Sequence, residues 1–317
     1  MDKRNKVSLF FVLSMLVSVC LVYLQLRMMD IQKLVNDISK IPFMLVVALI
    51  IFNLILFYPL AMRWHILLGR KHFQLQNTLF HYMVSNFFNF FTPSNLGGDA
   101  YRLASFRTPD TGTDKLLLLV AFERVLSLIL WLLLVVGVLS IDRAIDGQLV
   151  DAVAHAFADI ASLFLVGATA TLLLLSASLA FYFLGRLKKV LSFIRCLMFN
   201  TFTFITVKRL ILIVTLTLLS VFGWAATFKF VGDCLEVRLG LHIWLLIAIF
   251  GELARLLPIA VQGIGVREGT FVFFGMFLGF AAEDFFLIAS AGYLILTLAM
   301  LISPIISIFH LKLQRLQ

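Results

Sequence analysis

The sequence has few charged residues and few cysteines, and each shortage excludes a class of protein. Charged side chains occupy 14 % of the 317 positions, whereas soluble domains carry about a quarter, so a fully water-exposed surface is excluded. The three cysteines, Cys20, Cys196 and Cys234, are an odd number without C-x-x-C spacing or neighbouring histidine clusters. This pattern excludes a disulfide framework and a zinc site, and we interpret the cysteines as packing residues.

Motifs for soluble chemistry are also missing. The glycine pairs are not followed by the G-K-[ST] of a nucleotide-binding loop, which excludes a self-contained ATP-driven pump. The histidines form no H-x-x-x-H pair, so we expect neither a metal site nor a cofactor. Nearly every long segment is apolar, which leaves no room for a separate soluble catalytic domain. The formal net charge of +9 therefore indicates loops that face the cytoplasm and not a nucleic-acid partner.

Hydrophobic residues, in contrast, make up 62 % of the chain. A helix that crosses about 30 Å of hydrocarbon needs about 20 apolar residues. The stretches of that length are Val7–Leu26, Pro42–Met62, Leu116–Ser140, Ile160–Leu184, Leu210–Val231 and Phe285–Phe309. The first is too long for the apolar core of a signal peptide and lacks a small-x-small cleavage site, so we expect a retained helix. The sequence thus predicts an all-α polytopic membrane protein with six full transmembrane helices, forming one integral membrane domain over residues 1–317.

Two further apolar regions, about 74–113 and 241–282, are interrupted near the middle by proline and glycine. The first contains FFTPSNLGGDAYR and the second LLPIAVQGIGVRE, and the halves on either side are too short to span a bilayer. Non-helical backbone at membrane depth is tolerated only where protein or a water-filled cavity satisfies its polar groups. We therefore expect two re-entrant, or broken, helical hairpins.

The distribution of lysine and arginine agrees with this assignment. With the N-terminus inside and each hairpin returning to its starting side, the inside segments hold 17 basic and 4 acidic residues, and the outside segments hold 6 and 10. The positive-inside rule then predicts cytoplasmic N- and C-termini in the cytoplasmic membrane. The basic segment 186–209 is interpreted either as an interfacial helix that touches anionic headgroups or as a loop that only fixes orientation.

The two hairpins share a spacing that predicts an internal repeat. In each, a glycine and an arginine follow the proline by five and nine residues: Pro93, Gly98 and Arg102 in the first, and Pro258, Gly263 and Arg267 in the second. Each hairpin also lies between the second and third long helix of its half, so we predict repeats at about 1–140 and 160–309. Three crossings per half make the repeats inverted, an arrangement typical of transporters.

Ionisable side chains within or next to the apolar regions are the predicted substrate-binding residues, because charges at membrane depth are expensive unless they are paired or hydrated. They are Asp99, Arg102, Glu123, Arg124, Glu252, Arg255, Arg267 and Glu268. Arginine presents a planar fork that suits phosphate, and hairpin tips expose helix N-termini that attract anions. Arg267 is our preferred headgroup contact, since Arg267 and Glu268 are adjacent and point in different directions.

Structural roles are the alternative for several of these residues. Glu123 could form an ion pair with a neighbouring helix, and the acidic and basic residues three positions apart at each tip could pair with each other. Asn86 and Asn89, which precede the first tip, are expected to cap or bridge broken backbone. These alternatives stay open at the level of the sequence.

The motifs resemble those of the lysylphosphatidylglycerol synthase transmembrane family, in its flippase-like domain. They are GGDAYR with Gly97, Gly98, Asp99 and Arg102, the pair Glu123 and Arg124, and P-x4-G-x-G-x-x-E with Pro258, Gly263, Gly265 and Glu268. The resemblance extends from the first helix to the last. In bifunctional members a soluble domain transfers lysine from aminoacyl-tRNA to phosphatidylglycerol, and we expect a stand-alone member without it. The resemblance implies lipid translocation, with substrates that include aminoacylated phospholipids and, by proposal, polyprenyl-linked or hopanoid lipids.

Our leading expectation is a lipid translocase that hydrolyses no ATP and is not an enzyme. Arg102 and Arg267 would bind the headgroup of an anionic or lipid-linked membrane lipid, while Asp99, Glu252 and Glu268 set pairing or coupling to protons. The alternatives are an intramembrane lipid or glycan transferase related to lysylphosphatidylglycerol synthesis, and an accessory subunit of a lipid-modifying complex. A homo-oligomer or a partner from lipid biosynthesis is compatible with all three.

Overall fold

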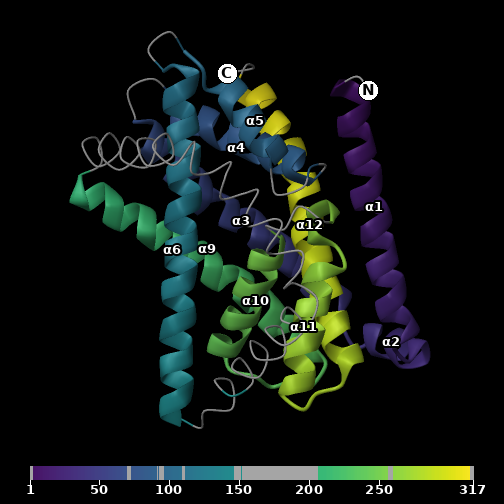
Figure 1. The fold of residues 1–317 in the computed structure, drawn as a ribbon. Helices are drawn as coiled ribbons and strands as arrows, with labels where there is room; N and C mark the ends of the chain where they lie inside the picture. Colours follow the sequence, from purple (N-terminus) through teal and green to yellow (C-terminus); the bar gives the residue numbers. More distant parts are fainter. Residues whose placement is uncertain are drawn as a thin grey trace, which may run out of the picture.

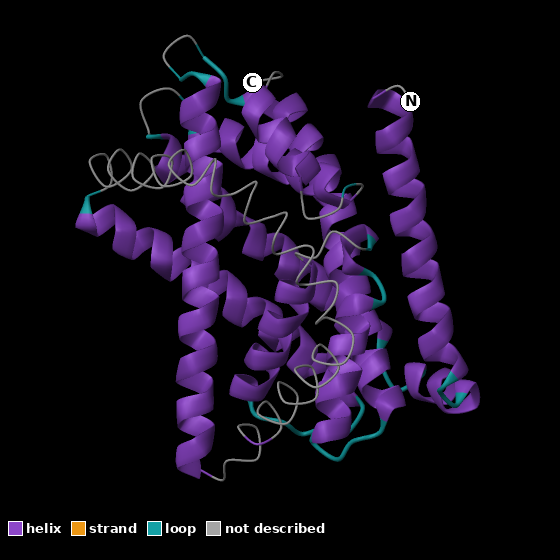
Figure 2. Cartoon of the chain, viewed as in Figure 1, coloured by secondary structure: helices purple, strands orange, loops and turns teal. Residues whose placement is uncertain are grey.

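A computed structural model describes residues 3–69, 73–90, 92, 96–108, 111–145, 151, 206–255 and 260–314. Throughout these residues the regular structure is helical, apart from one isolated bridge between Thr108 and Thr111 (Figure 2). The all-α prediction is therefore confirmed. The long apolar runs form helices because a helix pairs all its backbone polar groups within the segment, as a bilayer requires.

Four helices are long and apolar enough to cross a membrane, and they coincide with four of the predicted spans. They are α3 (Phe43–Leu68), α6 (Thr113–Ile145), α9 (Val207–Cys234) and α12 (Ala282–Gln314). The helix α1 (Lys3–Arg27) covers the first predicted span, and with α2 (Ile31–Ile38) it forms a pair bent by 98° that is a fifth candidate. The chain is therefore a multi-pass membrane protein. The predicted span Ile160–Leu184 lies outside the described residues, as does segment 186–209 up to residue 205.

The short helix α2 is held in place by an N-cap and by an ion pair to α12. Asp30 caps it, because the side-chain Oδ1 accepts hydrogen bonds from the backbone N–H of Gln32 at 2.8 Å and of Lys33 at 3.2 Å. The Lys33 ammonium group also lies 2.7 Å from a carboxylate oxygen of Asp284, in the first turn of α12. The turn after α1 is thereby attached to the end of the bundle where α12 begins.

The two interrupted regions each form a pair of shorter helices, as predicted. The first pair is α4 (Leu75–Phe90) with α5 (Leu96–Ser105). The second pair is α10 (Leu241–Arg255) with α11 (Val266–Phe277), and the 3-10 turn η2 (Val261–Gly263) lies between these two helices. In Figure 1 the first pair lies at the end of the bundle where α1 begins and α12 ends, and the second pair lies toward the opposite end. Pro93 and Pro258 are outside the described residues.

Two apolar clusters hold the helices together, one beside each hairpin. Trp64, Tyr82 and Phe106 belong to the first, around α3, α4 and α5. Trp244, Phe271 and Phe285 belong to the second, around α10, α11 and α12. Side chains of α6 that point away from the bundle are exposed and apolar, as expected of a helix that faces lipid.

Candidate functional site

A cavity of about 330 Å³ lies inside the helix bundle, within the size range of small-molecule sites. Its wall includes residues from both hairpins and from α3, α6, α9 and α12. The charged residues that line it are Arg63, Asp99, Arg102, Glu123, Arg124, Glu252, Arg255 and Arg267. The structure thus brings together seven of the eight predicted substrate-binding residues, and Glu268 is the one that does not line the cavity.

The charges of the first half form one continuous network, which we call the first-half network. Glu123 on α6 pairs with Arg63 on α3, and its second oxygen lies 2.6 Å from Nη1 of Arg102 on α5. Arg102 also pairs with Asp99, and Asp99 accepts from Nε of Arg124 at 2.8 Å. Both oxygens of both carboxylates have arginine partners. The structural alternatives considered for Glu123 and for Asp99 with Arg102 are therefore present in the structure.

Arg63 is the member of this network that the sequence interpretation missed. Like Asp99 and Arg102, it is less than 10 % exposed within the bundle. Arg63 Nη1 donates to Thr217 Oγ1 on α9 at 3.0 Å, so this arginine joins α3, α6 and α9. The signal was the apolar run that continues past Arg63 and extends α3 to Leu68.

Arg102 is held by aromatic faces as well as by carboxylates. Its guanidinium carbon lies 4.5 Å from the ring centroid of Trp64 and 5.6 Å from that of Tyr82. Cation–π contacts of this kind stabilise a desolvated arginine in a fixed position. Arg102 is consequently held both by aromatic rings and by carboxylates.

The start of α5 is capped by two side chains, one at the end of α4 and one just after it. Thr92 Oγ1 accepts from the Gly97 N–H at 2.7 Å, and Asn89 Oδ1 accepts from the Gly98 N–H at 2.8 Å. These bonds satisfy two of the backbone donors that a helix N-terminus leaves open. The prediction that Asn89 bridges broken backbone is confirmed. The neighbouring Asn86 lines the cavity.

We expect Gly98→Ala to destabilise the protein by about 1–3 kcal/mol, the usual effect of overpacking. A Cβ at Gly98 would lie 2.5 Å from the backbone oxygen of Ser85, so α4 and α5 would have to separate. Gly137→Ala on α6 is the matched control, because no atom of the described residues lies within 4 Å of a Cβ there. The thermal unfolding midpoint in detergent should fall for Gly98→Ala and stay level or rise for Gly137→Ala. Equal midpoints for both variants would contradict the tight approach.

The second hairpin uses its carboxylates differently. Glu252 and Arg255 form an ion pair three residues apart on α10, as the spacing predicts. Glu268 Oε2 accepts a hydrogen bond of 2.6 Å from the backbone N–H of Gly265, at the start of α11. Gly265 has a φ of 86°, a conformation that glycine adopts without strain. The Glu268 carboxylate therefore caps the backbone of the tip through Oε2.

Arg267 differs from the other arginines of the cavity. It is 5 % exposed, and its guanidinium carbon lies 3.8 Å from the ring centroid of Tyr293 on α12. Its Nε has no hydrogen-bond partner, and no carboxylate of the described residues lies within ion-pair distance of it. A buried guanidinium without a counterion is costly, so this position favours an anion.

The two tips meet at Gln262. Its side-chain Nε2 donates to the backbone oxygen of Asn89 at 2.6 Å, which links η2 to the end of α4. Gln262 adopts a φ of 54°, which is uncommon for a residue with a side chain. Helix α1 supports the same tip, because Ser18 Oγ accepts from the Val261 N–H at 3.0 Å and Gln25 Nε2 donates to the Gly265 oxygen at 2.6 Å. Sequence spacing alone gave no indication of these long-range bonds.

Equal spacing in the sequence does not give the two tips equal helices. Helix α5 begins at Leu96, three residues after Pro93, whereas α11 begins at Val266, eight residues after Pro258. The difference follows from the caps, since residues of α4 cap the first tip and Glu268 caps the second. Arg102 and Arg267 nevertheless line the same cavity.

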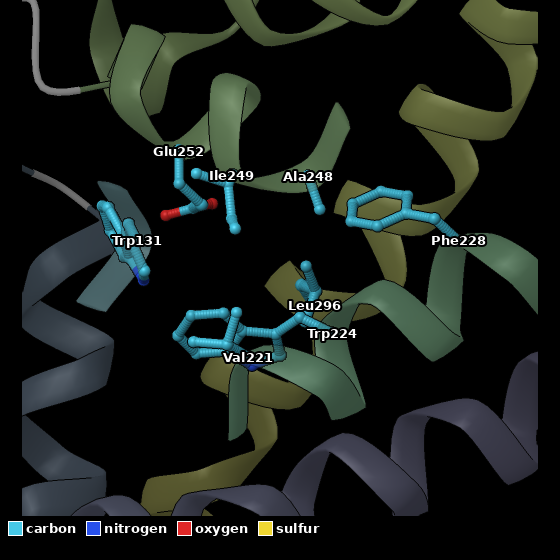
Figure 3. Close-up of a pocket in the computed structure, with 8 residues that line it drawn as sticks. All are labelled: Trp131, Val221, Trp224, Phe228, Ala248, Ile249, Glu252 and Leu296. Carbon is cyan, nitrogen blue, oxygen red and sulfur yellow. The ribbon is translucent and has the colours of Figure 1, made fainter. Parts of the chain in front are cut away.

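A small apolar pocket adjoins the cavity. It has a volume of about 10 Å³ and shares Trp131, Trp224 and Leu296 with the cavity wall. Figure 3 shows the Glu252 carboxylate at its edge, between Ile249 and Trp131 in this view. The charged site is thus continuous with an apolar surface of α6, α9 and α12.

Metal ligands are not grouped in the described part of the chain, where no cluster of three or more His, Cys, Asp or Glu residues could hold an ion. Among known protein families, the one described as the lysylphosphatidylglycerol synthase TM region matches residues 11–306. No curated protein and no solved structure matches the chain. The family match covers every residue that lines the cavity.

Proposed function

The chain belongs to the lysylphosphatidylglycerol synthase transmembrane family, and from that premise we propose that it is a lipid translocase of the cytoplasmic membrane and not an enzyme. A lipid headgroup would cross through the cavity between the two hairpins while the acyl chains stay in the bilayer. The observation that carries this proposal is the cavity itself. It is a charged site of about 330 Å³ inside a bundle whose helices are long and apolar enough to span a membrane.

We also propose the finer architecture of six spans and two re-entrant hairpins, arranged as inverted repeats with both termini in the cytoplasm. The positions of α4–α5 and α10–α11 toward opposite ends of the bundle support this arrangement (Figure 1). The contact between Gln262 and Asn89 supports it too, because it joins the tips of two hairpins that approach from opposite ends. A site between such tips is reachable from either side as the halves move.

The first-half network keeps the cavity charged at membrane depth. Isolated charges there would be expelled or neutralised, whereas paired ones are retained. Arg124 is the member with the most exposed side chain, 39 %, and its partner is Asp99. We therefore expect a headgroup phosphate to compete with Asp99 for Arg124, while Arg63 and Arg102 hold their positions.

Reconstitution into liposomes tests the proposal. Phospholipids with a fluorescent acyl chain are incorporated into both leaflets, and a reductant that cannot cross the bilayer quenches the outer label. With the protein present we expect quenching to continue into the inner-leaflet pool, at a rate that grows with protein content. Quenching that stops at the outer leaflet for every lipid tried would contradict translocation. Mass spectrometry of the same lipids should show no new covalent product, whereas such a product would favour the transferase alternative.

A further inference from the structure

The cavity carries an excess of positive charge. Five arginines and three carboxylates line it, which gives a formal net charge of +2. The excess has two sources. The first-half network contains three arginines and two carboxylates, and Arg267 has no carboxylate partner among the described residues. The pair of Glu252 and Arg255 is neutral.

Two of the three carboxylates that line the cavity, Asp99 and Glu123, have both oxygens paired with arginine, whereas Glu252 is paired through Oε2. Asp99 pairs with Arg102 and Arg124, Glu123 with Arg63 and Arg102, and Glu252 with Arg255. A ligand ammonium group could reach Asp99 or Glu123 only by displacing an arginine into a buried position without a counterion.

The hydrogen-bonding groups that remain open point to the same chemistry. Buried donors of the cavity wall that have no hydrogen-bond partner among the described residues include Asn86 Nδ2, Trp131 Nε1 and the Nε atoms of Arg63, Arg102 and Arg267. The buried acceptor of the wall without a hydrogen bond among the described residues is Oε2 of Glu252, and this atom already forms an ion pair with Arg255. A wall rich in open donors is complementary to a ligand rich in acceptor oxygens, such as a phosphate group.

From these three observations we propose that the cavity selects lipids whose headgroup is net negative, such as a phosphodiester or phosphomonoester lipid, and discriminates against cationic aminoacylated headgroups. Lysylphosphatidylglycerol carries one negative phosphate and two amino groups, so its headgroup is net positive at neutral pH. The lipid that gives the family its name is therefore a poor substrate for this member. This inference rests on the proposed translocase function and narrows its substrate class.

Arg267 and Tyr293 form the centre of the proposed anion site. The ring of Tyr293 fixes the guanidinium plane, which leaves the edge of the fork to donate to phosphate oxygens. The apolar pocket with Trp131 and Trp224 continues the site toward a surface suited to the lipid's apolar part. An anionic lipid would satisfy the open Nε of Arg267 and supply its missing counterion.

A comparison of the transport rates of lipids with opposite headgroup charge tests the inference. Liposomes with the protein receive acyl-labelled phosphatidylglycerol, phosphatidic acid or lysylphosphatidylglycerol, and the rate of movement is measured for each. We expect the two anionic lipids to move about tenfold faster or more than the cationic one, because they gain charge-assisted hydrogen bonds. Lysylphosphatidylglycerol moving as fast as phosphatidylglycerol would overturn the charge selectivity and leave the translocase function intact. Background rates for all three lipids would overturn both.

Two further arms identify the source of the anion and do not depend on transport of labelled lipid alone. Uptake of inorganic phosphate into the same liposomes should stay at background, and uptake with no lipid movement would show that a free anion is the ligand. In detergent, short-chain phosphatidylglycerol should raise the thermal unfolding midpoint of the wild type. It should raise the midpoint of Arg238→Gln equally, since this arginine lies in an exposed loop, and leave that of Arg267→Gln unchanged. Equal shifts in all three proteins would contradict the assignment to Arg267.

Discussion

Glu123→Gln is expected to destabilise the protein by about 3–5 kcal/mol, the typical effect of removing one partner from a buried ion pair. Glu123 is 5 % exposed and binds two arginines, Arg63 through one oxygen and Arg102 through the other. Glutamine keeps the volume of the side chain but loses the charge, and its amide group presents donors to a guanidinium. Arg63 then has no carboxylate partner in the network, and Arg102 shares the single remaining carboxylate, Asp99, with Arg124. The measurement is the thermal unfolding midpoint of purified protein in detergent.

A surface ion pair gives the matched control for this variant. Asp233 lies 2.6 Å from Lys229, four residues apart on α9, and both side chains are about one-third exposed. Because exposed pairs contribute less than about 1 kcal/mol, Asp233→Asn should change the midpoint little. The double variant Arg63→Gln with Glu123→Gln should be more stable than the sum of the two single losses predicts, since one buried charge leaves with its partner. Equal midpoints for Glu123→Gln and Asp233→Asn would contradict the role assigned to the network.

Arg267→Gln is expected to have the opposite profile, with folding retained and transport lost. Arg267 has no carboxylate partner in the described chain, so its removal relieves a buried charge and should leave the unfolding midpoint unchanged or higher. Hydrogen bonds to charged groups are worth about 1.5–3 kcal/mol, which corresponds to roughly a tenfold to hundredfold loss of affinity for an anionic headgroup. The rate of phosphatidylglycerol movement, measured in liposomes below saturation, should fall by a similar factor.

The conservative replacement separates charge from shape at this position. Lysine keeps the charge but lacks the planar fork that stacks on Tyr293, so Arg267→Lys should retain part of the transport rate. If Arg267→Gln moved phosphatidylglycerol at the wild-type rate, the anion site would have to lie elsewhere in the cavity.

The helices of this protein were largely predictable because their cause is local. Each long apolar run satisfies the length that a bilayer requires, and α3, α6, α9 and α12 form where those runs occur. The helix pairs of the two hairpins were predictable for the same reason, since proline and glycine interrupt apolar runs at known positions. Boundaries were less certain, and α3 extends six residues beyond the expected end at Met62.

The partners within the site were not predictable, because they are set by packing between distant helices. The spacing of Glu252 and Arg255 indicated their ion pair, a contact within one helix. Nothing local indicates that Glu123 meets Arg63, that Arg267 stacks on Tyr293, or that Gln262 bonds to Asn89. Most of the charged residues that line the cavity could be predicted from the sequence. Which arginine has no carboxylate partner among the described residues could not be predicted.

If the protein is a lipid translocase, a lipid headgroup occupies the cavity between the two hairpin tips. An experimental structure determined in a bilayer disc that contains phosphatidylglycerol tests it most directly. We expect density for a phosphate within hydrogen-bonding distance of Arg267, with the lipid tails leaving past Trp131 and Trp224. Lipid phosphates found only around the outer surface of the bundle, with the cavity holding water alone, would contradict it.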